Sequence, residues 1–202
     1  MLQIKKFYSG KKVLITGCTG FLGKVILEKV LWSCPDINQV FVMVRAKRKT
    51  LPMDRVKFEI LSSPCFKRLK QRHHGNDNFL KWAESKIVPV QGDLVIDRLG
   101  LSQHERALIT ENVDVIINSA ASVNFDDPLH DALQINFFGC QRMLELAKEC
   151  KNLAVFTQIS TAYVNCNKKG YIEELIYESD QDIESLVRSI MAKNVKEVKD
   201  KE

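Results

Sequence analysis

The sequence has no long apolar run. None of its 202 residues lies in a stretch approaching the roughly 18 apolar residues of a membrane-spanning helix, and its first residues lack the apolar core of a signal peptide. The net charge is only +5, and the basic residues are scattered. These absences argue against a transmembrane segment in this chain and against a nucleic-acid partner. The composition predicts a soluble globular domain.

Patterns that form metal sites or disulfides are also missing. The six cysteines contain no C-x-x-C pair and have no zinc-type spacing with the four histidines. The adjacent His73 and His74 belong to the polar stretch 73–78, which predicts an exposed loop rather than a pair of metal ligands. We therefore expect no metal site, reduced cysteines and an intracellular location.

Short apolar runs alternate with segments of helical periodicity along the chain. The expected strands are 12–16, 39–45, 86–91, 114–118 and 154–159. The expected helices are 20–33, 55–61, 65–70, 102–112 and 127–150. This alternation predicts an α/β fold with a doubly wound parallel sheet of Rossmann type, truncated after its fifth strand, in the order 3-2-1-4-5. The predicted domain covers residues 1–178, and a charged helical tail covers 179–202.

Local patterns predict how the later helices begin and pack. Ser102 and Glu105 form a capping box that opens helix 102–112. Asp127 followed by Pro128 predicts the N-cap and first turn of the next helix. The buried stripe predicted for that helix is Leu133, Phe137, Cys140, Leu144 and Ala147. The apolar face predicted for a helix in the tail is Ile183, Leu186, Val187, Ile190 and Met191.

Three glycines directly follow the first strand with the spacing G-x-x-G-x-x-G. Gly17 suits a tight turn, Gly20 suits close approach of a pyrophosphate, and Gly23 suits packing of the helix onto the strand. A pyrophosphate would then meet the free N–H groups at the helix N-terminus. The pattern predicts a dinucleotide-binding loop; the alternative is an ordinary strand-to-helix turn.

Side chains after three other strands suggest the rest of the site. NAD-binding folds often place an acidic residue at the end of the second strand, but here Arg45 stands there, which favours the 2′-phosphate of NADP. Lys47, Arg48 and Lys49 follow, and we expect them to be solvated. Asp93 is positioned either to meet the adenine or to cap the next turn. The small residues Ser119, Ala120 and Ala121 end the fourth strand, where a ligand would approach.

Together these motifs resemble a known superfamily. Thr16-Gly17-x-x-Gly20-x-x-Gly23, Gly92-Asp93-Leu94, Ser119-Ala120-Ala121, Asn136-Phe-Phe-Gly139 and Ile159-Ser-Thr-Ala-Tyr-Val-Asn165 are similar to an extended short-chain dehydrogenase/reductase. Val42-Met-Val-Arg45, Ser160-Thr-Ala-Tyr-Val-Asn-Cys166 and Gly170-Tyr-Ile-Glu-Glu174 are similar, more narrowly, to the male-sterility-type fatty acyl-CoA reductases. The resemblance implies NADPH-dependent reduction of long-chain acyl-CoA, through the aldehyde, to fatty alcohol.

The resemblance also implies where the enzyme acts and which residues act. It implies a location at the endoplasmic reticulum or peroxisomal membrane face, or otherwise in the cytoplasm. Any membrane association would be made by a C-terminal part outside this chain. The pyrophosphate would be lined by Gly17, Thr19, Gly20, Phe21 and Leu22, and Thr16 and Gly23 would be further cofactor-binding residues. The adenine would meet Asp93 and Leu94. Thr161, with Ser160 as the weaker candidate, would polarise the substrate carbonyl. Asn136 would support the hydrogen-bond network of the active site, or would simply bond the backbone.

One motif of that family is not found at the expected place. Catalysis there needs a tyrosine with a lysine four residues later, and among the four tyrosines only Tyr8 has one, Lys12. Tyr8 precedes the first strand, so we expect it at the wrong end of the sheet. The chain is therefore predicted to be an N-terminal cofactor-binding part, inactive alone. A non-catalytic NADP-binding or regulatory protein and another extended short-chain reductase or epimerase remain as alternatives.

Overall fold

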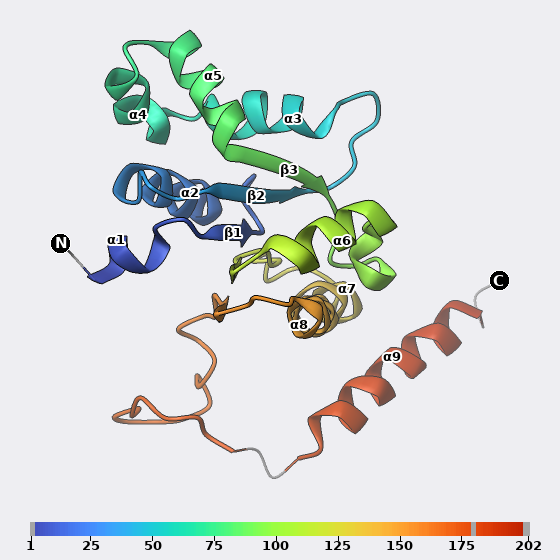
Figure 1. The fold of residues 1–202 in the computed structure, drawn as a ribbon. Helices are drawn as coiled ribbons and strands as arrows, with labels where there is room; N and C mark the ends of the chain where they lie inside the picture. The colour runs from blue at the N-terminus through green and yellow to red at the C-terminus, as the bar shows by residue number, and fades with distance from the viewer. Residues whose placement is uncertain (1–2, 179–180, 200–202) are drawn as a thin grey trace.

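A five-stranded parallel sheet forms the centre of the protein, in a computed structural model that describes residues 3–178 and 181–199 (Figure 1). Its strands lie in the order β3-β2-β1-β4-β5, which confirms the predicted topology. The bounds are Lys12–Ile15 for β1, Gln39–Val44 for β2, Ile87–Gln91 for β3, Val115–Asn118 for β4 and Val155–Gln158 for β5. Each lies within two residues of its prediction at either end.

Helices cover both faces of this sheet because its central strands are apolar on both sides. Val13 and Ile15 of β1 belong to one buried cluster with Leu27 and Leu31 of α2 (Phe21–Ser33). Leu14, between them, belongs to a second cluster with residues of α6 (Gln103–Asn112) and α8 (Gly139–Glu149). The alternation of side chains along one strand thus builds two cores, one on each face.

The segment between β2 and β3 is helical and lies on the same face as α2 (Figure 1). It comprises α3 (Pro52–Arg55), the π-helix η1 (Val56–Leu61), the 3₁₀ turn η2 (Pro64–Phe66), α4 (Lys67–Arg72) and α5 (Asn76–Lys86). The prediction of a polar loop over 73–78 is wrong from Asn76 onward, where α5 begins. Burial of Phe79 and Ala83 on the inner face of α5 outweighs the polar residues of its first turn.

The helices before and after β4 test the capping predictions. The capping box of Ser102 and Glu105 is present at the start of α6. The predicted N-cap at Asp127 is wrong, because α7 (Leu129–Leu133) begins one residue later, with Pro128 at its N-cap. The Asp127 carboxylate instead accepts hydrogen bonds from the side chains of Ser122 and Asn124. It stabilises the loop before the helix rather than the helix itself.

A π-helical turn explains an error in the predicted buried stripe. The helical segment 129–149 contains α7, then the π-helix η4 (Gln134–Phe138), then α8. A π-turn holds one residue more than an α-turn, and one residue rotates a helix by about 100°. The stripe extrapolated through η4 is therefore displaced by one position in α8. The structure buries Gly139, Met143 and Leu146, whereas Leu144 is exposed and Cys140 is half-buried. The predicted burial of Ala147 is confirmed.

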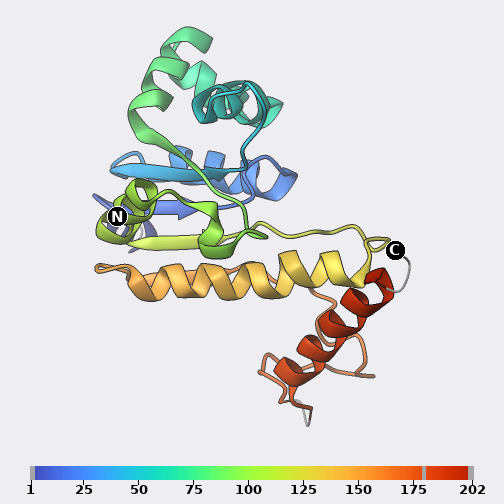
Figure 2. The ribbon, with the colours of Figure 1, turned by 90° about the vertical axis from the view of Figure 1, so that its right-hand side faces the viewer.

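The two ends of the described chain lie away from the sheet centre. Helix α1 (Gln3–Tyr8) precedes β1, and α9 (Ile183–Lys199) contacts α7 (Figure 2). The helix predicted in the tail is present; Val187 is buried, while Ile183 and Leu186 remain exposed. Residues 179–180 and 200–202, which include the predicted boundary of the tail, lie outside the described residues. The edge strand β5 is largely exposed.

Two further findings concern the expected lack of a membrane-spanning helix and the expected state of the cysteines. Among the described residues, no helix has the length and apolar character needed to cross a membrane. All six cysteines are free. Burial raises the pKa of the Cys18 thiol to about 12, so this thiol stays protonated at neutral pH.

Candidate functional site

The turn between β1 and α2 requires glycine at two positions. Gly17 has a φ of +75°, and a Cβ there would lie 2.8 Å from backbone atoms of Ser119 and Ala120. A Cβ on Gly23 would lie 2.3 Å from the Gly17 carbonyl oxygen, so the first turn of α2 packs directly on the loop. Gly17 therefore suits the predicted tight turn, and Gly23 suits the predicted close packing.

The third glycine faces open space instead. A Cβ on Gly20 would meet only the Gly17 carbonyl oxygen within 4 Å, at 3.3 Å. Gly20 is the N-cap of α2, no side chain caps that helix, and its first turn holds no acidic residue. Thr19, Phe21 and Leu22 are exposed around it. The free N–H groups of this turn, with an open approach at Gly20, fit a pyrophosphate.

Thr16 forms the buried floor of this loop. Its side-chain hydroxyl donates to Asn118 Oδ1 at 2.6 Å and accepts from the backbone N–H groups of Ser119 and Ala120 at 3.1 and 3.0 Å. Thr16 is 1 % exposed. Its hydroxyl therefore holds the ends of β1 and β4 together. Because these three hydrogen bonds occupy the hydroxyl, it is not free to bond the cofactor, although Thr16 was predicted as a cofactor-binding residue.

The same network continues through a residue that sequence analysis missed. Asn118 Nδ2 donates to Gln158 Oε1 at 2.7 Å, and the Cys140 thiol donates to the same oxygen at 3.2 Å. Gln158 thus joins the ends of β4 and β5 to α8. Its only signal in the sequence is a polar residue at the end of an apolar strand, the same position that Asn118 occupies.

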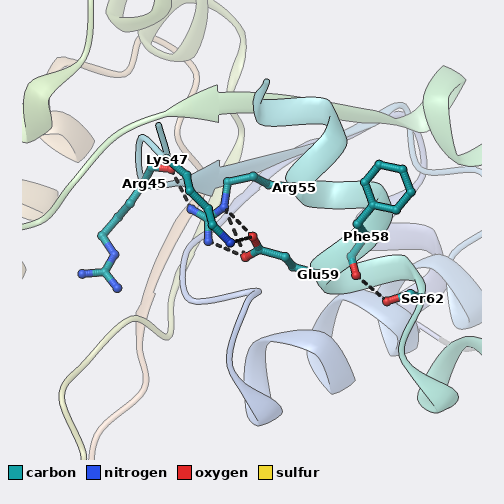
Figure 3. Close-up of polar contacts among 6 residues, drawn as sticks. All are labelled: Arg45, Lys47, Arg55, Phe58, Glu59 and Ser62. Atoms are coloured by element: carbon teal, nitrogen blue, oxygen red, sulfur yellow. Dashed lines mark hydrogen bonds and ion pairs between the residues drawn. The ribbon is translucent and has the colours of Figure 1, made fainter. Parts of the chain in front are cut away.

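Arg45 directly follows β2 and is exposed (Figure 3). Its guanidinium has no hydrogen bond or ion pair with any described residue. Lys47 is exposed, as expected, and also forms an ion pair with Glu59 of η1 at 2.8 Å. Arg48 and Lys49 are exposed, in agreement with the prediction. The free cation at the end of β2 is compatible with a phosphate ligand.

Residues after β3 and β4 line the same edge of the sheet. Asp93 Oδ1 accepts a hydrogen bond from the Val95 N–H at 3.2 Å, which is the turn-capping alternative. Leu94 is buried against Gly139, where a Cβ would lie 2.9 Å from the Leu94 Cβ. Ala121 is exposed, while the Ser119 hydroxyl is buried without a hydrogen-bond partner among the described residues.

The predicted catalytic side chains lie on two segments. Asn136 lies in the π-helix η4, and its side-chain amide bonds both the N–H and the carbonyl of Ser122, at 2.8 and 3.0 Å. It therefore holds the loop that follows β4. Thr161 and Ser160 follow β5 and are exposed. The Thr161 hydroxyl accepts from the Tyr163 N–H at 3.2 Å, which leaves its own proton free to donate.

Comparison with known proteins identifies the family. The family model described as "Male sterility protein" matches residues 15–201. The chain belongs to the male sterility protein family. Fatty acyl-CoA reductase 1 of Mus musculus is 42 % identical over 190 residues, which cover 94 % of this chain and 35 % of that protein. Fatty acyl-CoA reductase 2, chloroplastic, of Arabidopsis thaliana is 41 % identical over 86 % of this chain and 28 % of its own length.

A solved structure agrees with this assignment. The reductase (R) domain of a nonribosomal peptide synthetase from Mycobacterium tuberculosis superimposes with a TM-score of 0.60 and 28 % identity, covering 78 % of this chain and 34 % of that one. The chain thus spans about a third of the length of these male sterility family relatives and of this solved structure. The predicted resemblance and the predicted fold class are both confirmed.

Neither Tyr8 nor Tyr163 pairs with a lysine at the site in the part of the chain that the structure describes. Tyr8 lies in α1, before β1, whereas the glycine loop follows β1, so Tyr8 is at the opposite end of the sheet. The Lys12 amine donates to Asn112 Oδ1 at 2.6 Å. Tyr163 is exposed, and its ring meets Phe125 edge-on with centroids 6.5 Å apart. The pair at Tyr8 and Lys12 is therefore unrelated to this site.

Proposed function

We propose that this chain carries the cofactor-binding part of a fatty acyl-CoA reductase that uses NADPH. The reaction would reduce a long-chain acyl-CoA, through the aldehyde, to a fatty alcohol. The observation that supports it best is the open, uncapped helix N-terminus at Gly20, after β1, together with the free guanidinium of Arg45 at the end of the neighbouring strand β2. The relatives at about 40 % identity support the acyl-CoA substrate.

The loop after β1 and the end of β2 would bind different phosphate groups of the cofactor. The N–H groups of the first turn of α2 would bind the pyrophosphate, and Arg45 would bind the 2′-phosphate. The small residues Ser119 and Ala120, held by Thr16, would leave room for the nicotinamide. The bound cofactor would supply the hydride.

Residues after β4 and β5 would act on the substrate carbonyl. Thr161 would donate its free hydroxyl proton in a hydrogen bond to the carbonyl oxygen, because the negative charge of the reduced carbonyl develops there. Asn136 would act indirectly, since its amide holds the loop at Ser122 rather than reaching a ligand. Ser160 is the neighbouring hydroxyl that could take the place of Thr161.

Titration with NADPH and NADH tests the cofactor choice. A charge-assisted contact with phosphate contributes about 1.5–3 kcal/mol, so we expect NADPH to bind roughly ten- to a hundred-fold more tightly than NADH. The variant Arg45→Ala should remove most of this difference. The control Arg48→Ala deletes the same charge from the same exposed segment and should preserve it. Equal affinity of the unmodified chain for both cofactors, or equal losses in the two variants, would contradict the proposal.

A further inference from the structure

The backbone at Arg45 is held by a side chain ten residues later in the sequence. The Arg45 carbonyl accepts a hydrogen bond from Arg55 Nη1 at 2.6 Å (Figure 3). The described residues give this carbonyl no second donor. In the figure, the Arg45 side chain extends away from Arg55, and Arg45 is exposed. Arg55 therefore fixes where the Arg45 side chain starts without occupying its guanidinium.

Arg55 is itself held in place by a carboxylate. Its Nη2 lies 2.5 Å from Glu59 Oε2, its Nε lies 3.2 Å from both carboxylate oxygens, and its side chain is only 11 % exposed. Lys47 Nζ donates to Glu59 Oε1 at 2.8 Å. Glu59 thus connects α3, through Arg55, with the segment after β2, through Lys47. We name Arg55, Glu59 and Lys47 the Glu59 cluster.

The segment that this cluster holds, residues 45–49, is exposed. Beyond Arg45, the chain turns tightly, with the Thr50 N–H donating to the Lys47 carbonyl at 3.1 Å and Lys49 at a φ of 60°. A long arginine side chain on a loosely held segment samples many positions and loses that freedom on binding. Fixing its backbone in advance reduces this cost.

We propose that Arg55 and Glu59 are positioning residues for cofactor selectivity, which present the free guanidinium of Arg45 to the 2′-phosphate of NADPH. This inference rests on the proposed function. It also explains why an acidic residue is tolerated so near a phosphate site: the charge of Glu59 is neutralised by two cations. Hydrogen bonds from Arg55 and then Lys47 lower the pKa of Glu59 to about 2, so the cluster keeps its charges throughout the pH range of a binding assay.

The test is the ratio of NADH to NADPH dissociation constants, because a merely structural change would weaken both cofactors alike. Arg55→Lys keeps the charge but cannot bond the Arg45 carbonyl and both carboxylate oxygens together. We expect it to lower NADPH affinity by about 3- to 10-fold, with NADH affinity unchanged. Glu59→Gln should act in the same direction. Glu84→Gln is the matched control, because Glu84 pairs with Lys57 of the same π-helix and no hydrogen bond or ion pair among the described residues joins it to Arg45, Arg55 or Lys47.

A double-mutant cycle separates positioning from direct contact. In the Arg45→Ala background, Arg55→Lys should cause no further change in the ratio. If Arg45→Ala alone leaves the ratio unchanged, the proposed cofactor choice fails. If Arg45→Ala lowers the ratio of dissociation constants but Arg55→Lys and Glu59→Gln do not, only the positioning role is overturned. The same holds if Arg55→Lys still lowers the ratio in the Arg45→Ala background. Glu59→Gln supplies the test if Arg55→Lys does not fold, as judged by thermal unfolding.

Discussion

Replacing Thr16 by valine tests how much the buried network contributes to stability. Valine has nearly the shape of threonine and suits a strand end, so the change removes three hydrogen bonds and leaves no cavity. It leaves Asn118 Oδ1 and the N–H groups of Ser119 and Ala120 without a partner. An unsatisfied buried polar group costs about 1–3 kcal/mol. Ser119 and Ala120 are only half-buried, so we take the low end and expect a loss of roughly 3 kcal/mol.

The measurement is thermal unfolding of matched variants. For a chain of this size, about 3 kcal/mol corresponds to a lowering of Tm by roughly 6–12 °C. Thr157→Val is the control, because Thr157 is exposed on β5 and makes no side-chain hydrogen bond with the described residues; it should change stability by less than about 0.5 kcal/mol. If the two variants unfold within 1 °C or so of each other, the reasoning about the Thr16 hydroxyl is refuted.

Two other substitutions probe binding and pH dependence. Gly20→Val should abolish binding of NADPH and NADH alike with Tm little changed, because Gly20 has an extended conformation and only one close neighbour; calorimetric detection of tight binding would refute this. Burial, reinforced by Arg72 and His74, lowers the pKa of His73, so the unfolded chain binds the proton more readily and stability should fall as pH drops through about 6.5. His73→Phe keeps a ring stacked on Trp82 and should flatten urea midpoints between pH 5 and 7; an unchanged slope would contradict the assignment.

The strand order could be predicted because continuous apolar runs and right-handed connections leave few alternatives. Val13, Leu14 and Ile15 are wholly buried, as a strand covered on both faces requires. Helix faces were less predictable. The apolar spacing of the helical segment 129–149 assumes 3.6 residues per turn throughout, and the π-helix at 134–138 breaks that assumption. The sequence carries no simple signal of a π-turn, so the predicted stripe was one residue out of register at Cys140 and Leu144, although Ala147 is buried as predicted.

Some features of the site were likewise predictable from the sequence, and others were not. The glycine loop was predictable, because two of its positions favour glycine for separate reasons: Gly17 has a positive φ, and Gly23 has no space for a Cβ beside the backbone. The hydrogen-bond partners of Thr16 and Arg45 were not predictable. Those of Thr16 depend on which strands become neighbours, and that of the Arg45 carbonyl depends on a side chain ten residues later. Asn118 lies 102 positions from Thr16 in the sequence and is reached only when β1 and β4 pair. Gln158 joins the same network only through the pairing of β4 with β5.

The exposed strand β5 has a consequence for the motions of the sheet. It pairs with β4 along only one side, and its side chains are largely outside the two cores, whereas β1 is paired on both sides and buried. Amide protons of β5 should therefore exchange with deuterium by local opening, and those of β1 only on global unfolding. Because Gln158 bonds Asn118, each opening of β5 would also release one end of the Thr16 network. The hydrogen-bond network that supports the glycine loop would thus depend on the pairing of the edge strand β5.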